Sequence, residues 1–277
     1  MPDRGHPRLA ADRRVPAGGG DELEPRWRDR ALTRRYAIYA LPGAITPDPV
    51  RELVERWLGR SADGAPVDGP LPDGWTRSEV DALTVKARRY GFHATLKAPF
   101  RLADHADPEL LDARVGELAR RSAAVVMPKL ALRELGGFFA LMAGAPAPEL
   151  QALGDSVVRE LDDLRHPVPD PLRRARRRPE LMSQRQRELL DAWDYPYVFE
   201  EFRPHFTLTD RIAADQQPRI RETLDHYLSA ELGRDLPIDA LCVFEEPAPE
   251  ARLHLRSVHP LSRVNAADAL ITTEARQ

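Results

Sequence analysis

The sequence has very little cysteine and no long apolar run. The single cysteine, Cys242, rules out an internal disulfide and argues against a metal site built from thiolates. It lies in the apolar run 240–244, so we expect a buried, small hydrophobic residue there. No apolar stretch reaches the ~18 residues that a membrane span needs, and residues 1–31 lack the apolar core of a secretory signal. We therefore expect a cytoplasmic protein without membrane contact, with residues 1–31 as a disordered arm.

The composition excludes a polycation. The 277 residues are 42% hydrophobic and 31% charged, which is typical of a globular chain, and the net charge is -3. DNA is therefore not an expected partner. The Arg-rich run 173–178 favours a solvated loop before a helix; the alternative is a basic loop that closes over a phosphate or touches an RNA end. An RNA end is thus a possible partner, but a small phosphorylated substrate is favoured.

What the sequence does contain is a repeated motif, His-x-Thr-Leu, within residues 90–97 and 203–209. Both stretches mix Phe, Thr and Leu with polar residues at period two, which predicts strands. Side chains at positions i and i+2 of a strand share a face. If the two strands meet, two imidazoles and two hydroxyls are predicted to line one pocket: His93, Thr95, His205 and Thr207.

The predicted elements after each motif follow the same order. An amphipathic helix (108–122 or 217–232) comes first, and a pair of strands follows. The first pair is separated by Gly136 and Gly137, a hairpin signal. This repeat indicates two related α+β lobes with equivalent strands facing each other across a cleft.

We therefore expect one bilobed domain over residues 32–262, and the alternative is two halves that fold separately. The predicted parts are lobes at about 32–145 and 196–262, a helical insertion at about 147–195 and a tail at 263–277.

The paired histidines suit acid–base chemistry on a phosphate ester. One imidazole can remove a proton from the attacking oxygen while the other protonates the leaving oxygen. Threonine hydroxyls can donate hydrogen bonds to phosphate oxygens, and such a site needs no metal. An unbroken strand would place Lys97 beside Thr95, where a cation would hold an anionic substrate. Tyr36 is a further candidate for substrate binding, although Tyr36 and Tyr39 point to opposite faces and either could line the cleft.

At these motifs the sequence resembles the 2H phosphoesterase superfamily, which is named for two His-x-Thr/Ser motifs. The closer resemblance is to a bacterial branch with the motif Tyr-Gly-Phe-His-Ala-Thr-Leu-Lys-Ala-Pro-Phe, present here intact at 90–100, and Arg-Pro-His-Phe-Thr-Leu-Thr, present at 203–209. That branch has no assigned function and is often encoded beside genes for phosphonate breakdown. The resemblance covers about residues 34–262, and the insertion and the N-terminal arm depart from compact members.

The resemblance implies a duplicated, bilobed α+β fold with two antiparallel sheets around a central cleft and outer helices. It implies that His93 and His205 are the catalytic pair and that Thr95 and Thr207 hold the phosphate. Members act on 2′,3′-cyclic phosphates or RNA ends, usually without metal, so no cofactor is expected. The neighbouring genes suggest a phosphorylated or cyclic-phosphate sugar from phosphonate metabolism.

The resulting expectation is a metal-independent phosphoesterase, specifically a cyclic phosphodiesterase for a sugar or nucleotide. One alternative is a non-catalytic binder of phosphate esters or RNA ends. A second is a metal hydrolase with the two histidines as ligands, although neither motif has carboxylates at ligand spacing. Which histidine is acid and which is base, and whether the reaction is hydrolysis or ligation, stay open.

Overall fold

The computed structural model describes residues 34–169 and 171–262, including all their side chains except those of residues 171–173. The expected arm at 1–31 and tail at 263–277 lie outside the described residues. Within them, eight α-helices and nine strands form an α+β structure, which confirms the predicted fold class. No helix in this part of the chain is long and apolar enough to cross a membrane.

A seven-stranded sheet forms the centre of the molecule, and all its register pairs are antiparallel. In spatial order its strands are β4 (Ala131–Leu135), β5 (Phe138–Met142), β6 (His205–Thr207), β2 (Ala94–Phe100), β1 (Arg35–Ala40), β8 (Ala240–Glu246) and β9 (His254–Pro260). A separate two-stranded sheet pairs β3 (Val125–Met127) with β7 (Leu236–Ile238). Cys242 lies buried in β8, as expected.

The two expected sheets are joined into one at a narrow seam. Strands β2 and β6, which carry the two motifs, share the single register pair Ala94 and Phe206. On either side of the seam the hairpins are exchanged between the sequence halves. The first-half hairpin β4–β5 pairs with β6 of the second half, and the second-half hairpin β8–β9 pairs with β1 of the first. The element order repeats among the described residues, but each motif strand is followed by one helix and three strands, where a pair of strands was predicted.

Two amphipathic helices pack on strands of the sheet. Helix α5 (Pro108–Arg121) packs on β8 and β9, and α6 (Pro148–Glu160) packs on β2. Their apolar residues recur every three or four positions and are buried, which is the pattern that stabilises a helix against a sheet. In α5 these are Leu111, Val115 and Leu118; in α6 they are Leu150, Leu153, Val157 and Val158.

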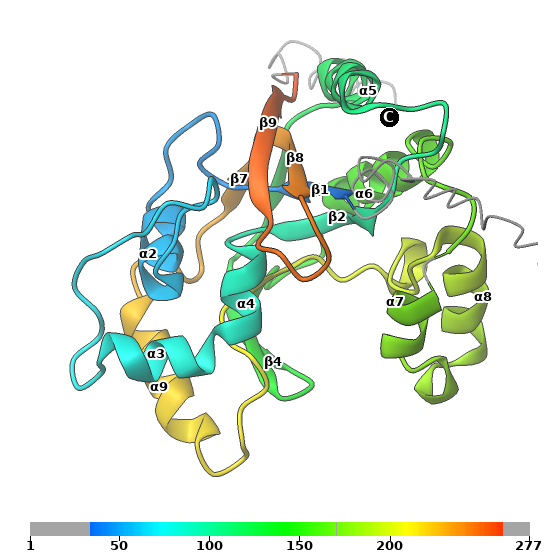
Figure 1. Cartoon of the computed structure of the whole chain (residues 1–277). Coiled ribbons are helices and arrows are strands. Elements are labelled where there is room, and N and C mark those ends of the chain that lie inside the picture. Colours follow the sequence, from blue (N-terminus) through cyan, green and yellow to red (C-terminus); the bar gives the residue numbers. More distant parts are fainter. Residues whose placement is uncertain (1–33, 170, 263–277) are drawn as a thin grey trace, which may run out of the picture.

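A second helical group surrounds Trp57. Helices α2 (Pro49–Leu58), α3 (Arg77–Leu83) and α9 (Gln217–Tyr227) lie together on one side of the sheet (Figure 1). The Trp57 ring lies 6.2 Å from the rings of Trp75 and Tyr227, centroid to centroid. Its indole Nε1 donates a 2.8 Å hydrogen bond to the carbonyl of Leu208, so the buried N–H is satisfied. This bond ties the helices to the residue that follows β6.

The middle of the insertion contains more helix than expected. The Arg-rich run 173–178 favours a loop, but residues Pro171–Arg176 form the short helix α7. The run has no apolar stripe, so the pattern could not reveal this helix. Further along the insertion, a 3-10 turn, Pro179–Leu181, is followed by helix α8 (Gln184–Trp193). Figure 1 shows α7 and α8 standing beside the sheet.

Candidate active site

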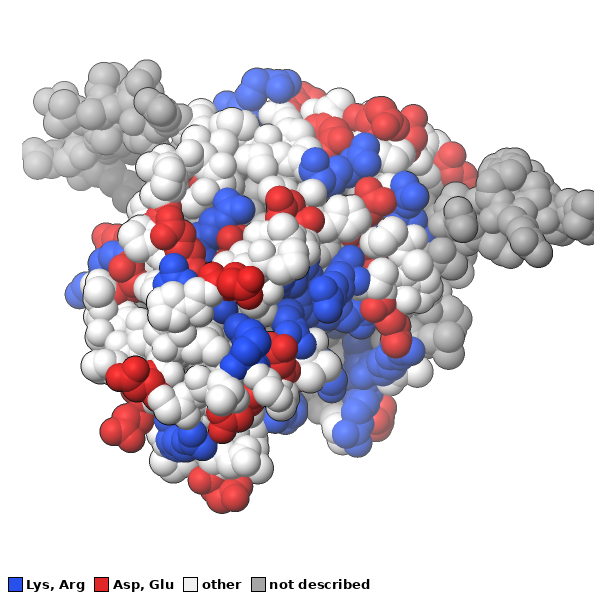
Figure 2. All heavy atoms as spheres, turned by 60° about the vertical axis from the view of Figure 1, so that its left-hand side comes forward, with Lys and Arg blue, Asp and Glu red and all other residues white. Residues whose placement is uncertain are grey.

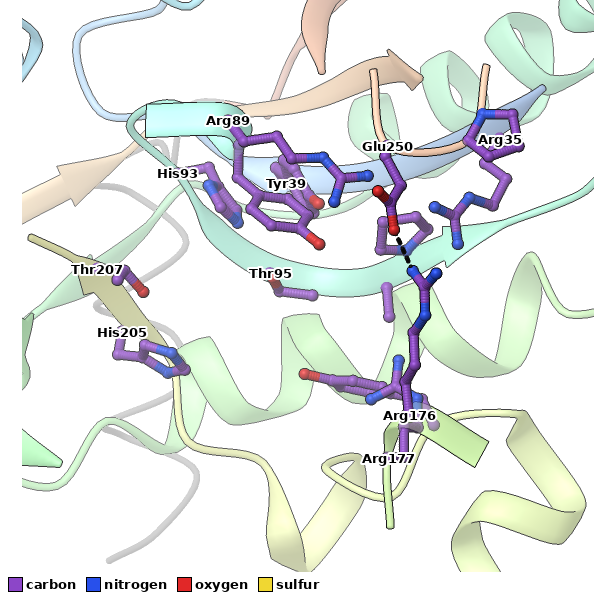
Figure 3. A pocket seen from close by; sticks show the side chains of 15 residues that line it. Arg35, Tyr39, Arg89, His93, Thr95, Arg176, Arg177, His205, Thr207 and Glu250 are labelled. Carbon is purple, nitrogen blue, oxygen red and sulfur yellow. Dashed lines mark hydrogen bonds and ion pairs between the residues drawn. The ribbon is translucent and has the colours of Figure 1, made fainter. Parts of the chain in front are cut away.

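One pocket of about 450 Å³ is lined by the side chains of both motifs (Figure 3). His93 precedes β2 and Thr95 lies within it, while His205 and Thr207 are the first and last residues of β6. Phe206 is buried and the two motif residues that flank it are partly exposed, which is the alternation that a strand imposes. The structure therefore brings the four predicted side chains together: His93, Thr95, His205 and Thr207.

The short helix α4 (Val85–Tyr90) leads the chain into the first motif, and side chains from elsewhere hold both its ends. At its start, Oδ1 of Asp210 accepts hydrogen bonds from the amides of Lys86 and Ala87, at 3.0 and 2.9 Å. At its end, the fully buried guanidinium of Arg60 donates to the carbonyls of Arg88 and Arg89, both at 3.0 Å. Asp210 directly follows the second motif, so one motif region fixes the approach to the other.

The two histidines are held in the same way. Nδ1 of His93 lies 2.9 Å from the carbonyl oxygen of Gly91, and Nδ1 of His205 lies 2.7 Å from that of Arg203. A carbonyl oxygen only accepts hydrogen bonds, so each Nδ1 carries the proton. In the neutral imidazole the lone pair is then on Nε2. Both rings thus have Nε2 available to exchange a proton with a ligand.

Burial lowers the pKa of both imidazoles. Desolvation is the main cause for His93 and brings its pKa from 6.5 to about 4, although the Gly91 carbonyl acts in the opposite direction. The nearby His205 adds a smaller lowering, since two protonated imidazoles repel each other. Burial likewise lowers the pKa of His205. Both rings are therefore neutral at pH 7 in the unliganded protein.

Tyr39, and not Tyr36, is the β1 tyrosine that lines the pocket. Tyr39 pairs with Thr95 across the strands, and cross-strand partners share a face. Its ring stacks on the His93 imidazole at a centroid distance of 3.9 Å. Tyr36 points to the opposite face, is 2% exposed and pairs in register with Glu245. Tyr36, which was the predicted candidate, therefore does not line this pocket.

The predicted position of Lys97 beside Thr95 is also wrong, because β2 contains a β-bulge. Thr95 pairs with Tyr39, but Lys97 pairs with Ile38, so two residues of β2 correspond to one step of β1. The extra residue turns Lys97 to the far face. There its Nζ lies 2.9 Å from Oδ1 of Asp162 and 3.3 Å from the carbonyl of Val158, at the end of α6. Lys97 is 5% exposed and fastens a helix to the sheet.

Four arginines that the motif analysis did not include also line the pocket. Arg35 is in β1, Arg89 is in α4, and the other two, Arg176 and Arg177, come from the Arg-rich run. The basic loop that could close over a phosphate was the less favoured prediction for that run, whereas nothing in the sequence singled out Arg35 or Arg89. In Figure 2, Lys and Arg side chains gather in a hollow of the surface.

A second pocket of about 410 Å³ shares Thr95, Tyr195 and His205 with the first. Its remaining wall includes three aromatic residues, Phe138, Tyr197 and Phe202, and two arginines, Arg203 and Arg211. His205 thus borders both pockets, while His93 borders only the first. Among the residues the structure describes, no group of three or more His, Cys, Asp or Glu side chains is placed to hold a metal ion.

Comparison with known proteins gives relatives and a family. The chain is 37% identical over 241 residues to a protein of Janthinobacterium sp. (strain Marseille) named ribose 1,5-bisphosphate phosphokinase PhnN; the match covers 84% of this chain and 52% of that protein. A protein of the same name from Laribacter hongkongensis (strain HLHK9) is 36% identical over 224 residues, or 80% of this chain and 50% of that one. The chain thus spans about half the length of these relatives. Residues 95–254, which include most of the pocket lining, match the model of a family described as a protein of unknown function (DUF1045). The chain belongs to that family.

Proposed function

We propose that this chain is a phosphoesterase in which His93 and His205 act as general acid and base, specifically a metal-independent cyclic phosphodiesterase. The observation that supports the proposal is that equivalent hydrogen bonds hold the two imidazoles. Each Nδ1 is held by the carbonyl two residues earlier, which leaves both Nε2 atoms for the substrate. Thr95 and Thr207 line the same pocket and can donate hydrogen bonds to the non-bridging phosphate oxygens.

The reaction would proceed by attack of water on the phosphorus of a cyclic phosphate. One Nε2 takes a proton from the water as the new P–O bond forms. The Nε2–H of the other imidazolium gives its proton to the ester oxygen as the old P–O bond breaks. Both pKa values are lowered in the unliganded pocket, so the acid must be protonated with the substrate in place. The negative phosphodiester would favour this, because an anion raises the pKa of a neighbouring imidazole.

The relatives' names support phosphorylated ribose as the substrate class, but they do not transfer a kinase activity. Both names refer to longer proteins, of which the match to this chain covers only 52% and 50%. The 277 residues contain no Gly-x-x-x-x-Gly-Lys-Ser/Thr, the phosphate-binding loop of many kinases. A cyclic-phosphate sugar or nucleotide, with a place in phosphonate metabolism, is our proposed substrate.

The test is hydrolysis of adenosine 2′,3′-cyclic phosphate and ribose cyclic phosphates in excess chelator. We expect turnover by the wild type and a loss of roughly 10²- to 10⁴-fold in kcat for both His93→Ala and His205→Ala. His105→Ala is the matched control, because His105 is exposed and does not line the pocket. Activity that survives both site substitutions would reject the pair, and activity that needs added metal would reject the metal-independent reaction.

The lowered pKa values also favour a second candidate, a non-catalytic binder of phosphate esters or RNA ends. With both imidazoles neutral at pH 7, the free pocket has no histidine ready to donate a proton. This candidate predicts saturable binding of a cyclic phosphate without product, and binding that persists when either histidine is removed. Calorimetry and product analysis on the same samples separate the two candidates.

A further inference from the structure

We propose that the arginine end of the pocket is a second anion site, which binds a phosphomonoester carried by the same substrate. The inference rests on the proposed function for the first phosphate, at the histidines. Figure 3 shows His93 and His205 toward one end, Thr95 between, and Arg35, Arg176 and Arg177 toward the other. The pocket volume of about 450 Å³ is within the usual range for small-molecule sites. One molecule with two phosphoryl groups could therefore reach both ends.

Arg177 is the strongest reason for an anion at this end. Its Nε is buried and has no hydrogen-bond partner. Its guanidinium carbon lies 4.5 Å from the centroid of the Tyr195 ring, and no carboxylate of the described residues pairs with it. A partly buried cation with an unused donor is costly, and a ligand anion would remove that cost. The planar guanidinium with several N–H donors fits a phosphate better than an ammonium would.

Glu246 positions two further arginines. Its carboxylate is fully buried and pairs with Arg35 through one oxygen and with Arg89 through the other. Arg89 also donates from Nε to the carbonyl of Ala251, at 3.1 Å. These bonds fix both guanidiniums, yet in the described part of the chain the Nη1 groups of Arg35 and Arg89 have no partner. The two arginines are thus held in place with a donor each to spare.

Glu250 occupies the position that an incoming anion would take. It lies in the turn between β8 and β9 and pairs with Arg176 of α7 across the pocket, at 2.5 Å. Both side chains are well exposed, at 60% and 67%, so the pair is weakly held. The four arginines and the two glutamates leave a net charge of +2. That matches a phosphomonoester, which carries about -1.5 to -2 near pH 7. A phosphate would displace the Glu250 carboxylate from Arg176.

The first experiment measures binding without turnover. Ribose 5-phosphate is titrated by calorimetry into a protein that carries His93→Ala and His205→Ala, and into the same protein with one further change. We expect Arg177→Gln to weaken binding at least about tenfold and Glu250→Gln to strengthen it, because a competing carboxylate is lost. Arg178→Gln is the matched control: Arg178 is the next residue, exposed, paired with Glu180 and outside the pocket lining.

Equal affinities for the Arg177→Gln and Arg178→Gln proteins would overturn the second site, as would weaker binding after Glu250→Gln. Neither result depends on whether the protein hydrolyses cyclic phosphates. Circular dichroism of each variant checks that the fold is retained.

The second experiment uses the intact histidines. We compare kcat/KM for adenosine 2′,3′-cyclic phosphate with and without a 5′-phosphate. We expect the wild type and Arg178→Gln to prefer the 5′-phosphorylated substrate, and Arg177→Gln to lose most of that preference. A wild type without preference would contradict the second site while leaving the phosphoesterase intact. A wild type that cleaves neither substrate would reject the phosphoesterase, and the binding experiment would then decide the second site alone.

Discussion

The ring of Tyr39 stacks on the imidazole of His93, with centroids 3.9 Å apart and planes inclined by 25°. Tyr39 is 1% exposed, so its ring covers one face of the imidazole and keeps water from it. The ring of Tyr90 lies further off, at 6.1 Å from His93. The stack therefore gives a physical cause for the burial that lowers the pKa of His93.

Replacing Tyr39 should raise the pKa of His93. In Tyr39→Ala water reaches the imidazole, so we expect the pKa to rise from about 4 toward 6.5. The change is followed by NMR titration of the histidine Cε1 proton. Tyr39→Phe keeps the stacked ring and should keep most of the lowering. If Tyr39→Ala titrates as the wild type does, the stack is not the cause.

His93 should make folding less favourable at acid pH. Its folded-state pKa of about 4 lies below the ordinary 6.5, so the unfolded chain binds the proton first as the pH falls. The neutral imidazole carries no such penalty above pH 6.5, and the free energy of unfolding declines between pH 6.5 and 4. At pH 4.5 the loss is about 2 to 3 kcal/mol relative to neutral pH.

Urea unfolding of the wild type and His93→Gln at pH 7.5 and 4.5 measures this contribution. Glutamine does not titrate, so we expect the variant to lose less stability than the wild type between the two pH values. An equal loss in both proteins would show that the acid sensitivity arises at other groups.

The Lys97–Asp162 pair should act on stability and leave catalysis unchanged. Asp162→Asn leaves the buried ammonium of Lys97 without its countercharge, which should cost about 3 kcal/mol of unfolding free energy. Lys97→Met should cost less, because Asp162 keeps its bidentate pair with Arg165. Urea unfolding measures both. Since Lys97 lies outside the pocket, kcat/KM of folded Lys97→Met should stay within about threefold of the wild-type value. A tenfold fall in kcat/KM would show that Lys97 acts on the substrate.

Gly91 should be required for the orientation of His93. Its φ of 75° and ψ of -174° lie in a region that is essentially restricted to glycine, and its carbonyl holds Nδ1 of the imidazole. Gly91→Ala should destabilise the protein by about 1 to 3 kcal/mol and lower kcat. Gly74, with a φ of 76° in an open loop, is the matched control. Gly74→Ala should lower the melting temperature and leave kcat unchanged. Equal losses of kcat in both variants would show that Gly91 has no specific role in orienting His93.

The strand and helix patterns were sufficient to predict most elements, because burial periodicity is local. The meeting of the two motifs was expected from the internal repeat. The hairpin at Gly136 and Gly137 and helix α5 lie within one residue or so of their predicted positions. The same rule failed at Lys97, since it assumes an unbroken period of two. A bulge depends on how β2 pairs with β1, and neither strand alone reveals it.

The arginine end of the pocket could not be predicted from the sequence for a different reason. Arg35 and Arg89 belong to segments far apart in the sequence, and they come together on the single buried carboxylate of Glu246. Only the sheet register and the placement of α4 determine that meeting. The choice between Tyr36 and Tyr39 likewise depended on which of them pairs with Thr95.

Because hairpins are exchanged between the two halves, the pocket can form only when the whole described chain has folded. Strand β6 is bordered by a hairpin synthesised before it, and β1 is bordered by one synthesised near the end of the described chain. Neither half can complete its own part of the sheet, so a fragment that ends before residue 240 keeps β2 beside β1 but lacks β8, the strand on the other side of β1. The pocket therefore forms only after the most distant pairings are made, which are slow steps in folding because they close long loops.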